Sequence, residues 1–485
     1  MNNTLLRHTT LLTGLAASLL FTACKRDPEV QPVAVVSPPT FKATSGPVTD
    51  GEVNNWILEN MKYYYLWNDK LPQNPNTNLT PDQFFLSLLY DRNNTTNTNR
   101  DRFSWLQQSA DELKASLSGV TKTTGMEFRL YFRDASQSSV VGAVIYVLPG
   151  SPASFAGVKR GDVFTRVNGE TLTNGNYASL LYNNAENFNF TFAKASGSTY
   201  TEDKAPKSIQ AILFQSDPVL LDTTYSVGGR TVGYVMYNQF VPGPNGSTTK
   251  TYDLKLDNIF AKFKTKGVNE LILDLRYNRG GYVSSSTNLA SLIGKNVTGK
   301  VFYAQEWNSN VMPYYDKQYG VGWNKQNFVD KSQNIGANLS RVIVLTTSST
   351  ASASELVING LKPFMNVITV GTTTTGKNVG SITISDPNNR IKWGIQPLTF
   401  RSVNADGTAD YGTGFIPKVE VREGTTDLKP LGSTADPLIS EAIFQLTGTR
   451  MARQATVPLV SSDLPLSSSI DRQAGGGNMF AEPIR

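Results

Sequence analysis

A serine and a lysine in the C-terminal half of the chain have the residue types and the setting for nucleophilic catalysis. Ser352 lies in the run TASASE over residues 350–355, between a predicted strand and a predicted helix. A serine at such a junction presents its hydroxyl beside helix N-terminal N–H groups, which stabilise negative charge. The same position is a common helix N-cap, so the position alone leaves both roles open.

Lys377 follows Gly376 after the next predicted strand, 25 residues beyond Ser352. With an unperturbed pKa of about 10.4, a lysine amine is protonated at neutral pH and cannot accept a proton. Burial among apolar side chains lowers that pKa and turns the amine into a base for a nearby hydroxyl. An ordinary surface lysine is the alternative interpretation.

Two adjacent glycines supply a third element. Gly280 and Gly281 end the segment DLRYNRGG, residues 274–281, at the carboxyl end of a predicted strand. Glycine lets backbone N–H groups approach a substrate closely. Together with the N–H of Ala353, one of these glycines could form an oxyanion hole for acyl transfer.

The composition excludes several competing chemistries. The only histidine is His8 and the only cysteine is Cys24, both near the N-terminus. Catalysis by Ser-His-Asp or Cys-His groups, and zinc sites built on His or Cys, therefore have no residues to use in the rest of the chain. The net charge of +6 is spread out, without a basic run, and does not indicate nucleic-acid binding. We expect no metal and no cofactor.

A nucleotide-binding alternative overlaps the lysine. Residues 371–377, GTTTTGK, fit the start of a phosphate-binding loop. The Ser or Thr needed for magnesium is replaced by Asn378, and residues 382–384 read as a strand where that loop requires a helix. The sequence therefore predicts no nucleotide.

The N-terminus indicates export. Residues 1–23 carry a basic start, a short apolar run and small residues, which is typical of a signal peptide. Cys24, directly after them, resembles the lipidation site of bacterial lipoproteins, although an ordinary signal peptide or an uncut anchor are the alternatives. We expect a lipid-anchored protein of the cell envelope, periplasmic or surface-facing. Lys25 favours the outer membrane. Residues 24–48 read as a flexible linker.

Changes in periodicity divide the remaining chain. Apolar residues at helical spacing predict a small helical domain over residues 49–118, and short strands with turns predict a β-rich domain over 119–200. Strands alternate with helices over residues 201–448, which predicts a mostly parallel sheet. Residues 449–485 hold too little apolar content to fold and are predicted to be a disordered tail.

The β-rich domain resembles a PDZ domain. Residues 156–169, AGVKRGDVFTRVNG, closely match the protease-associated kind of PDZ domain. By that resemblance the loop Gly125, Met126, Glu127 and Phe128 binds a peptide carboxylate, while the peptide adds a strand to the sheet edge. A sheet domain with ordinary turns is the alternative.

The segments around Gly280, Ser352 and Lys377, in this order, resemble the tail-specific (C-terminal processing) proteases, peptidase family S41. The resemblance covers roughly residues 50–448 and includes the interval of 25 residues. It implies that Ser352 is the nucleophile and Lys377 its base. One position departs from the family pattern, because Ser381 replaces a glutamine that often helps to hold the amine. Glu355 is a further candidate for supporting the site.

The predicted fold is multidomain α+β: an N-terminal helical domain, a PDZ domain and an α/β catalytic core of the ClpP/crotonase-like tail-specific protease type. The predicted function is a serine endopeptidase acting on unfolded or C-terminally exposed polypeptides. The alternative is an inactive peptide- or ligand-binding lipoprotein on the same fold, which the Ser381 departure favours.

Overall fold

The computed structural model describes residues 35–40, 45–133, 136–183, 185–196, 199–425, 427–450, 465–472 and 479–482. A mostly parallel sheet of six strands carries the segments that contain Gly280, Ser352 and Lys377. Only β11 is antiparallel to its neighbour; the other pairs are parallel. In order, the strands are β11 (Val219–Val227), β12 (Arg230–Tyr237), β13 (Glu270–Asp274), β17 (Arg341–Thr346), β18 (Asn366–Gly371) and β23 (Val419–Glu420).

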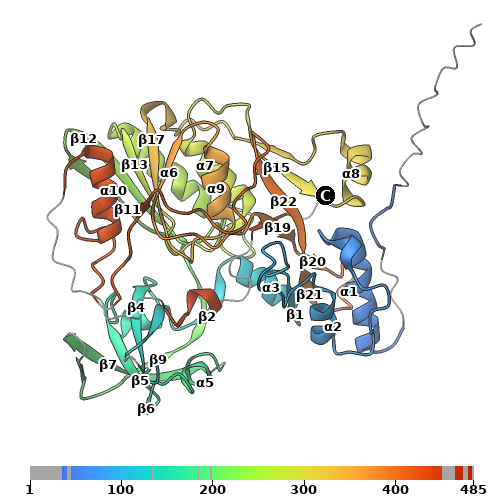
Figure 1. Ribbon diagram of the computed structural model, residues 1–485, viewed down its shortest axis with the longest axis horizontal. Helices are drawn as coiled ribbons and strands as arrows, with labels where there is room; N and C mark the ends of the chain where they lie inside the picture. The colour runs from blue at the N-terminus through green and yellow to red at the C-terminus, as the bar shows by residue number, and fades with distance from the viewer. Residues whose placement is uncertain are drawn as a thin grey trace, which may run out of the picture. The chain divides into compact units, whose positions relative to one another are not determined.

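Helices cover both faces of this sheet (Figure 1). Leu271 and Leu273 of β13 pack with α6 (Thr251–Thr265), α7 (Val283–Ile293) and α9 (Ala353–Leu361). Ile272, between them, packs with α10 (Pro437–Thr447) on the other face. Successive side chains of a strand point to opposite faces, so a strand buried on both faces is a continuous apolar run.

A second sheet contains the strands that follow Gly280 and Lys377 in the chain. Its strands, in order, are β14 (Gly281–Tyr282), β25 (Met479–Ala481), β19 (Val379–Ile382), β22 (Leu398–Asn404), β15 (Val301–Trp307) and β16 (Lys325–Asn327). Near these strands the chain also forms α8 (Val311–Tyr319) and the short 3-10 helix η2 (Gly336–Asn338).

The β-rich region has an apolar core of its own, which includes Phe128, Phe164 and Phe190. Its elements are β3 (Met126–Phe132), β4 (Val140–Val147), α4 (Pro152–Phe155), β5 (Val163–Val167), β6 (Glu170–Thr171), α5 (Tyr177–Leu181), β7 (Asn187–Ser196), β8 (Thr199–Glu202) and β9 (Lys207–Gln210). Because β7 pairs with both β8 and β9, the sheet continues past residue 200, where we predicted the boundary. Beyond it, β10 (Ile212–Gln215) pairs with β2 (Val120–Thr123).

The N-terminal helices share their core with the second half of the chain. They are α1 (Asp50–Tyr64), η1 (Asn68–Lys70), α2 (Pro81–Leu88) and α3 (Ala110–Leu117). Trp56 and Ile57 of α1 belong to one apolar cluster with Ile395 and Leu398. A short sheet also joins β1 (Trp105–Gln107) to β21 (Gly394–Gln396) and β20 (Ile384–Ser385).

Part of the predicted disordered tail is ordered. Residues 465–472 include β24 (Ser467–Ser468), which pairs with β3, and the 3-10 helix η3 (Ile470–Arg472). Residues 479–481 form β25, which pairs with both β14 and β19. For these residues the prediction is wrong, because the pairing satisfies their backbone groups and because Met479 and Phe480 are buried.

The lipidation prediction falls outside the structure, since Cys24 and the rest of residues 1–34 are not among the described residues. Within the part of the chain that the structure describes, no helix combines the length and apolar character needed to cross a bilayer.

Candidate active site

Three chain segments meet at one edge of the parallel sheet. They follow the carboxyl ends of the neighbouring strands β13, β17 and β18 and contain Gly280, Ser352 and Lys377 respectively. The carbonyl oxygen of Asn278 accepts hydrogen bonds from Ala351 N at 3.1 Å and from Ser354 Oγ at 3.0 Å. These bonds join the glycine segment to the serine segment.

Ser352 begins α9 with an unusual backbone conformation. Its φ of 64° and ψ of −114° lie in a region that non-glycine residues rarely adopt. Such strain persists only where the surrounding structure holds it, and it is common at functional sites. The Ser352 hydroxyl is buried and, among the described residues, has no hydrogen-bond partner. Ser352 and Glu355 have the arrangement of a capping box, but within the described residues the Ser352 side chain makes no hydrogen bond to the helix.

Glu355 connects the serine to the lysine. Its Oε2 accepts the backbone N–H groups of Ser352 and Lys377, each at 2.8 Å. Its Oε1 accepts Gly376 N at 2.8 Å and Thr374 Oγ1 at 2.5 Å. Burial raises the pKa of Glu355, while these four hydrogen bonds oppose that rise. The side chain that we predicted as a supporting group thus fixes both loops.

Lys377 is fully buried, with its Nζ 4.6 Å from the centre of the Phe103 ring. Burial lowers its pKa well below the ordinary value for a lysine. The charges of Asp101 and Glu355 act in the opposite direction, and those of Arg279 and Arg102 add to the lowering. The environment therefore favours the neutral amine, which can accept a proton.

The two glycines and Ala353 supply the candidate oxyanion N–H groups. Gly281 has a φ of 135°, and a Cβ atom there would lie 2.2 Å from the carbonyl oxygen of Phe240, so glycine is required. The N–H of Gly280 already donates to Asn278 Oδ1 at 2.8 Å. The N–H of Ala353, in the first turn of α9, has no acceptor within the described ranges.

Ser381 lies on β19, buried beside the C-terminal segment. Its Oγ donates to the carbonyl oxygen of Met479 at 3.3 Å. The residue that departs from the family pattern therefore contacts a strand that we had predicted to be disordered.

The N-terminal region contributes site residues that we did not predict. Arg102 Nη2 donates to the carbonyl oxygens of Gly376 at 2.5 Å and Gly412 at 3.2 Å. Phe103, the next residue, provides the ring beside the lysine amine. No local signal marks either residue, because Arg102 and Gly376 are 274 positions apart in the sequence.

A buried ionic cluster lies behind the glycine segment. Arg276 donates to both oxygens of Asp274 at 2.9 Å, and its Nη1 donates to Glu423 at 3.0 Å and Asp436 at 2.8 Å. Burial alone would raise the pKa of Glu423, but Arg276, Arg160 and Arg129 lower it well below its usual range. Arg129 lies on β3, so the cluster links the β-rich region to the active-site loop.

The loop predicted to bind a peptide carboxylate lies at the start of β3 and is not part of the Ser352 site. Gly125 N donates to Thr123 Oγ1 at 2.9 Å, and Met126 N donates to Thr124 Oγ1 at 3.3 Å. Farther along, the backbone N–H of Phe128 donates to Ser469 Oγ at 2.8 Å, and the Ser469 hydroxyl contacts the Glu127 carboxylate. All four loop residues thus lie beside an edge that the chain itself already pairs.

The phosphate-loop alternative gains no support from the geometry. The strand β19 follows Lys377, and the N–H groups of Gly376 and Lys377 donate to Glu355, where a phosphate loop needs free amides and a helix. In the described ranges, no group of three or more His, Cys, Asp or Glu residues is placed to hold a metal ion.

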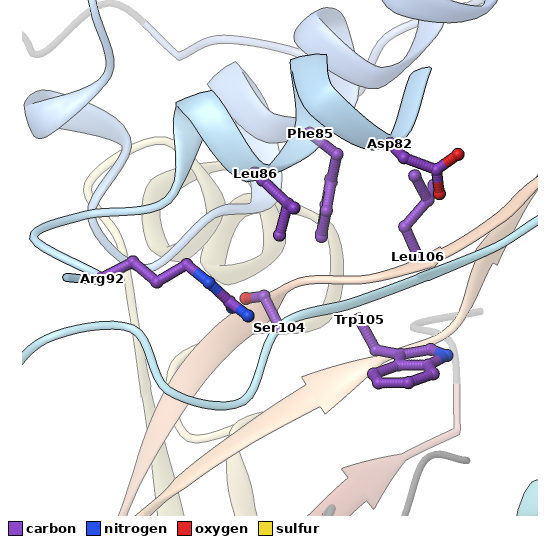
Figure 2. A pocket seen from close by; sticks show the side chains of 7 residues that line it. All are labelled: Asp82, Phe85, Leu86, Arg92, Ser104, Trp105 and Leu106. Atoms are coloured by element: carbon purple, nitrogen blue, oxygen red, sulfur yellow. The ribbon is translucent and has the colours of Figure 1, made fainter. Parts of the chain in front are cut away.

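A small hollow of about 110 Å³ lies in the N-terminal region (Figure 2). It is bounded by α2 on one side and by the strand segment around Trp105 on the other. Neither Ser352 nor Lys377 lines it. Its lining residues are Asp82, Phe85, Leu86, Arg92, Ser104, Trp105 and Leu106.

Comparison with known families gives two matches. Residues 231–421 match Peptidase family S41, and residues 52–105 match the Peptidase S41 N-terminal domain. The first range contains both dyad residues and the glycine pair, and the second contains the Arg102 and Phe103 segment.

The individual relatives have low sequence identity to this chain. The carboxyl-terminal-processing protease of Picosynechococcus sp. is 26% identical over 276 residues, which cover 55% of this chain and 57% of that protein. The carboxy-terminal processing protease CtpA of Bacillus subtilis is 24% identical over 291 residues, which cover 58% and 53% respectively. The chain thus spans little more than half the length of these relatives.

A solved structure assigned to the S41 proteases, from Bacteroides fragilis NCTC 9343, is similar over most of its length. It is 25% identical, with a TM-score of 0.66, and the match covers 84% of this chain and 99% of that one. The mixed α/β fold that we predicted from the sequence is thereby confirmed. With the catalytic and N-terminal domain matches falling on the segments that form the site, the chain belongs to peptidase family S41.

Proposed function

We propose that this protein is a serine endopeptidase that uses Ser352 as its nucleophile and Lys377 as its general base. One observation carries the proposal: a single buried carboxylate, Glu355, fixes both a strained serine, whose hydroxyl has no partner among the described residues, and a buried lysine with a lowered pKa. A merely structural N-cap serine would use its hydroxyl on the helix, and a surface lysine would remain charged.

The first half-reaction forms an acyl-enzyme. Lys377 Nζ takes the proton of Ser352 Oγ, and Oγ attacks the carbonyl carbon of the scissile peptide bond. The tetrahedral intermediate collapses as the C–N bond breaks, and the lysine ammonium returns its proton to the departing amine. The N–H groups of Ala353 and of Gly280 or Gly281 would hold the oxyanion, once the Gly280 N–H leaves Asn278 Oδ1 or Gly281 is released from its pairing with β25.

The second half-reaction is hydrolysis. The neutral Lys377 takes a proton from water, the resulting hydroxide attacks the ester carbon, and Ser352 Oγ leaves with the returned proton. The products are a new C-terminal carboxylate and the regenerated serine. Every step uses groups of this chain and water.

The proposed substrates are unfolded or C-terminally exposed polypeptides. The β-rich region, which we infer to be a PDZ domain, supports this class through the edge of β3, where an extended peptide would add a strand in place of β24. We place the domain boundaries near residues 118 and 448 and, because β9 extends the β-rich sheet, near residue 210 in place of 200. The names of the relatives, carboxyl-terminal processing proteases, agree with this substrate class.

The proposed location is the cell envelope. Export would follow from the signal peptide over residues 1–23, and acylation of Cys24 would anchor the protein in a membrane. Labelling cells with a fatty-acid analogue tests this anchor. Incorporation into the wild type but not into Cys24→Ala is expected, and equal labelling of both would contradict it.

Cleavage of a fluorescently labelled unfolded protein tests the catalytic proposal. We expect the wild type to cleave it and Ser352→Ala and Lys377→Met to lose cleavage. Lys362→Met is the control, since Lys362 is an exposed lysine at the end of α9, outside the proposed dyad. Full activity of Ser352→Ala would refute the mechanism. Peptide binding without cleavage by any variant would support the inactive-binder alternative.

A further inference from the structure

The chain's own C-terminal segment fills a strand position next to the dyad. The strand β25 (Met479–Ala481) lies between β14 and β19 and pairs in parallel with both. Gly281 is opposite Met479 on one side, and Ser381 is opposite Phe480 on the other. These neighbours are a proposed oxyanion residue and the residue four positions after Lys377.

The side chain of Phe480 occupies an apolar pocket. Its ring lies edge-on against Tyr282, with the ring centres 4.2 Å apart. Leu113 and Leu117 of α3 form the rest of its surroundings, and the Phe480 side chain is 3% exposed. The helix α3, the glycine segment and the C-terminal segment thus meet at the Phe480 side chain. Such a pocket selects a large apolar group.

Met479 is held by polar and apolar contacts together. Ser381 Oγ donates to its carbonyl oxygen at 3.3 Å, and Ser402 Oγ lies 3.4 Å from its sulfur atom. The residue is fully buried within the main apolar cluster. Backbone pairing supplies general affinity, and the two side chains supply selectivity, which is how strand addition recognises peptides.

An upstream part of the tail is paired in the same manner with β3. Ser467 and Ser468 lie antiparallel to Leu130 and Arg129. The backbone N–H of Ser469 donates to the carbonyl oxygen of Phe128 at 3.0 Å. One tail therefore covers both the edge that we predicted to bind peptides and the strand position next to the dyad.

Ser352 and Lys377 are each 0% exposed in this arrangement. A polypeptide substrate cannot reach the hydroxyl unless part of the protein moves. The strand β25 is held by only three paired residues, whereas the loops around it are tied by Glu355 and by the ionic cluster. Because β25 is a three-residue strand, few backbone pairs need to break for it to leave.

We propose that the position between β14 and β19 is the substrate slot, that its Leu113, Leu117 and Tyr282 pocket selects a large apolar side chain, and that residues 479–481 occupy it as an intramolecular competitor. This inference rests on the proposed peptidase function. A tethered segment acts at an effective concentration of the order of millimolar, so a free substrate binds only when the tail leaves.

Release of the tail tests the competition. In the full chain, Phe480→Asp places a charge in the apolar pocket and should expel β25, and a chain ending at Arg472 lacks the strand altogether. We expect both to raise kcat/KM for an unfolded substrate by about tenfold or more. Glu482→Gln is the matched control, because this exposed side chain changes charge in the same tail without entering the pocket.

Direct binding separates the slot from catalysis. The receiver is the Ser352→Ala chain ending at Arg472, and the probe is a fluorescent peptide of residues 473–485. We expect saturable binding, lost when the peptide carries Phe480→Asp. Tyr282→Ala in the receiver should weaken the binding as well.

The outcomes are distinguishable. Binding of the peptide together with activation by both tail variants supports the proposal. Active enzyme whose rate is unchanged by either variant overturns the competition and leaves the peptidase function intact. Binding with no cleavage by any form removes the proposed function but supports the slot. Absence of peptide binding overturns the slot whatever the activity.

Discussion

The backbone N–H groups of Ser352 and Lys377 donate to the same oxygen atom, Oε2 of Glu355, each at 2.8 Å. Ser352 and Lys377 follow different strands, and the Glu355 carboxylate joins their two loops. Glu355 is thus a positioning residue, since it acts through the two groups that react.

Replacing this carboxylate should disable catalysis before it unfolds the protein. Glu355→Gln puts an amide NH₂ group against N–H donors, so at least one hydrogen bond is lost. We expect kcat to fall by about a hundredfold or more, and the free energy of unfolding to fall by about 1–3 kcal/mol. Measuring kcat and urea unfolding in parallel checks both, with the exposed Glu420→Gln as the control. Equal activity of Glu355→Gln and wild type would rule out the positioning role.

The pH dependence of cleavage reports on the lysine. Because the neutral amine is the base, kcat/KM should rise with pH and level off above the lowered pKa of Lys377. Arg279→Met removes a positive charge that lowers this pKa, so the rising limb should shift to higher pH. Asp471→Asn is the control, since it breaks the same ion pair but keeps the guanidinium. A rising limb of the pH profile that shifts equally in Arg279→Met and Asp471→Asn would contradict the electrostatic explanation.

The buried Asp253, on α6, should make the free energy of unfolding depend on pH, independently of catalysis. Burial raises its pKa to about 6. Its stabilising contribution is therefore complete below its unfolded pKa of about 4 and lost as the pH rises through 6. Asp253→Asn should raise the free energy of unfolding by about 1–3 kcal/mol at pH 8, with little difference from wild type at pH 4. Urea unfolding at the two pH values measures this, and an equal difference at both would refute it.

Removing the charge of Glu423 from the ionic cluster should strongly lower the free energy of unfolding. Glu423→Gln leaves buried guanidinium groups underpaired, and we expect about 3–5 kcal/mol less stability at pH 7. Because the folded-state pKa of Glu423 is depressed, its contribution is present above its unfolded pKa and is lost as the pH falls through the folded value. The exposed pair of Arg401 and Glu306 is the comparison, where Glu306→Gln should cost about 0–1 kcal/mol. Chemical unfolding from pH 7 to pH 3 checks both expectations.

The position of the dyad could be predicted because it depends on short patterns. Alternating strands and helices put Ser352 and Lys377 after successive strands, and parallel strands end at the same edge of a sheet. The structure brings these residues and Glu355 together as expected. Their catalytic roles stay predictions until the variants above are measured.

The long-range contacts could not be predicted. Phe103 reaches Lys377 through a short loop from the N-terminal region, and Arg129 reaches Glu423 across 294 positions. Neither residue belongs to a periodic pattern that names its partner. The tail was misjudged for another reason. Its average composition is polar, yet two adjacent apolar residues, Met479 and Phe480, suffice to anchor a three-residue strand.

The convergence of three loops at one sheet edge also determines when, during folding, the proposed active site can form. The glycine segment and Lys377 are about a hundred positions apart in the sequence, and they meet only after β13, β17 and β18 have paired. Parallel pairing of distant strands is a late and slow event in folding. If the proposed mechanism holds, a chain still emerging or half folded has Ser352 and Lys377 but not the assembled site, so it could not cleave itself before its own segments have packed.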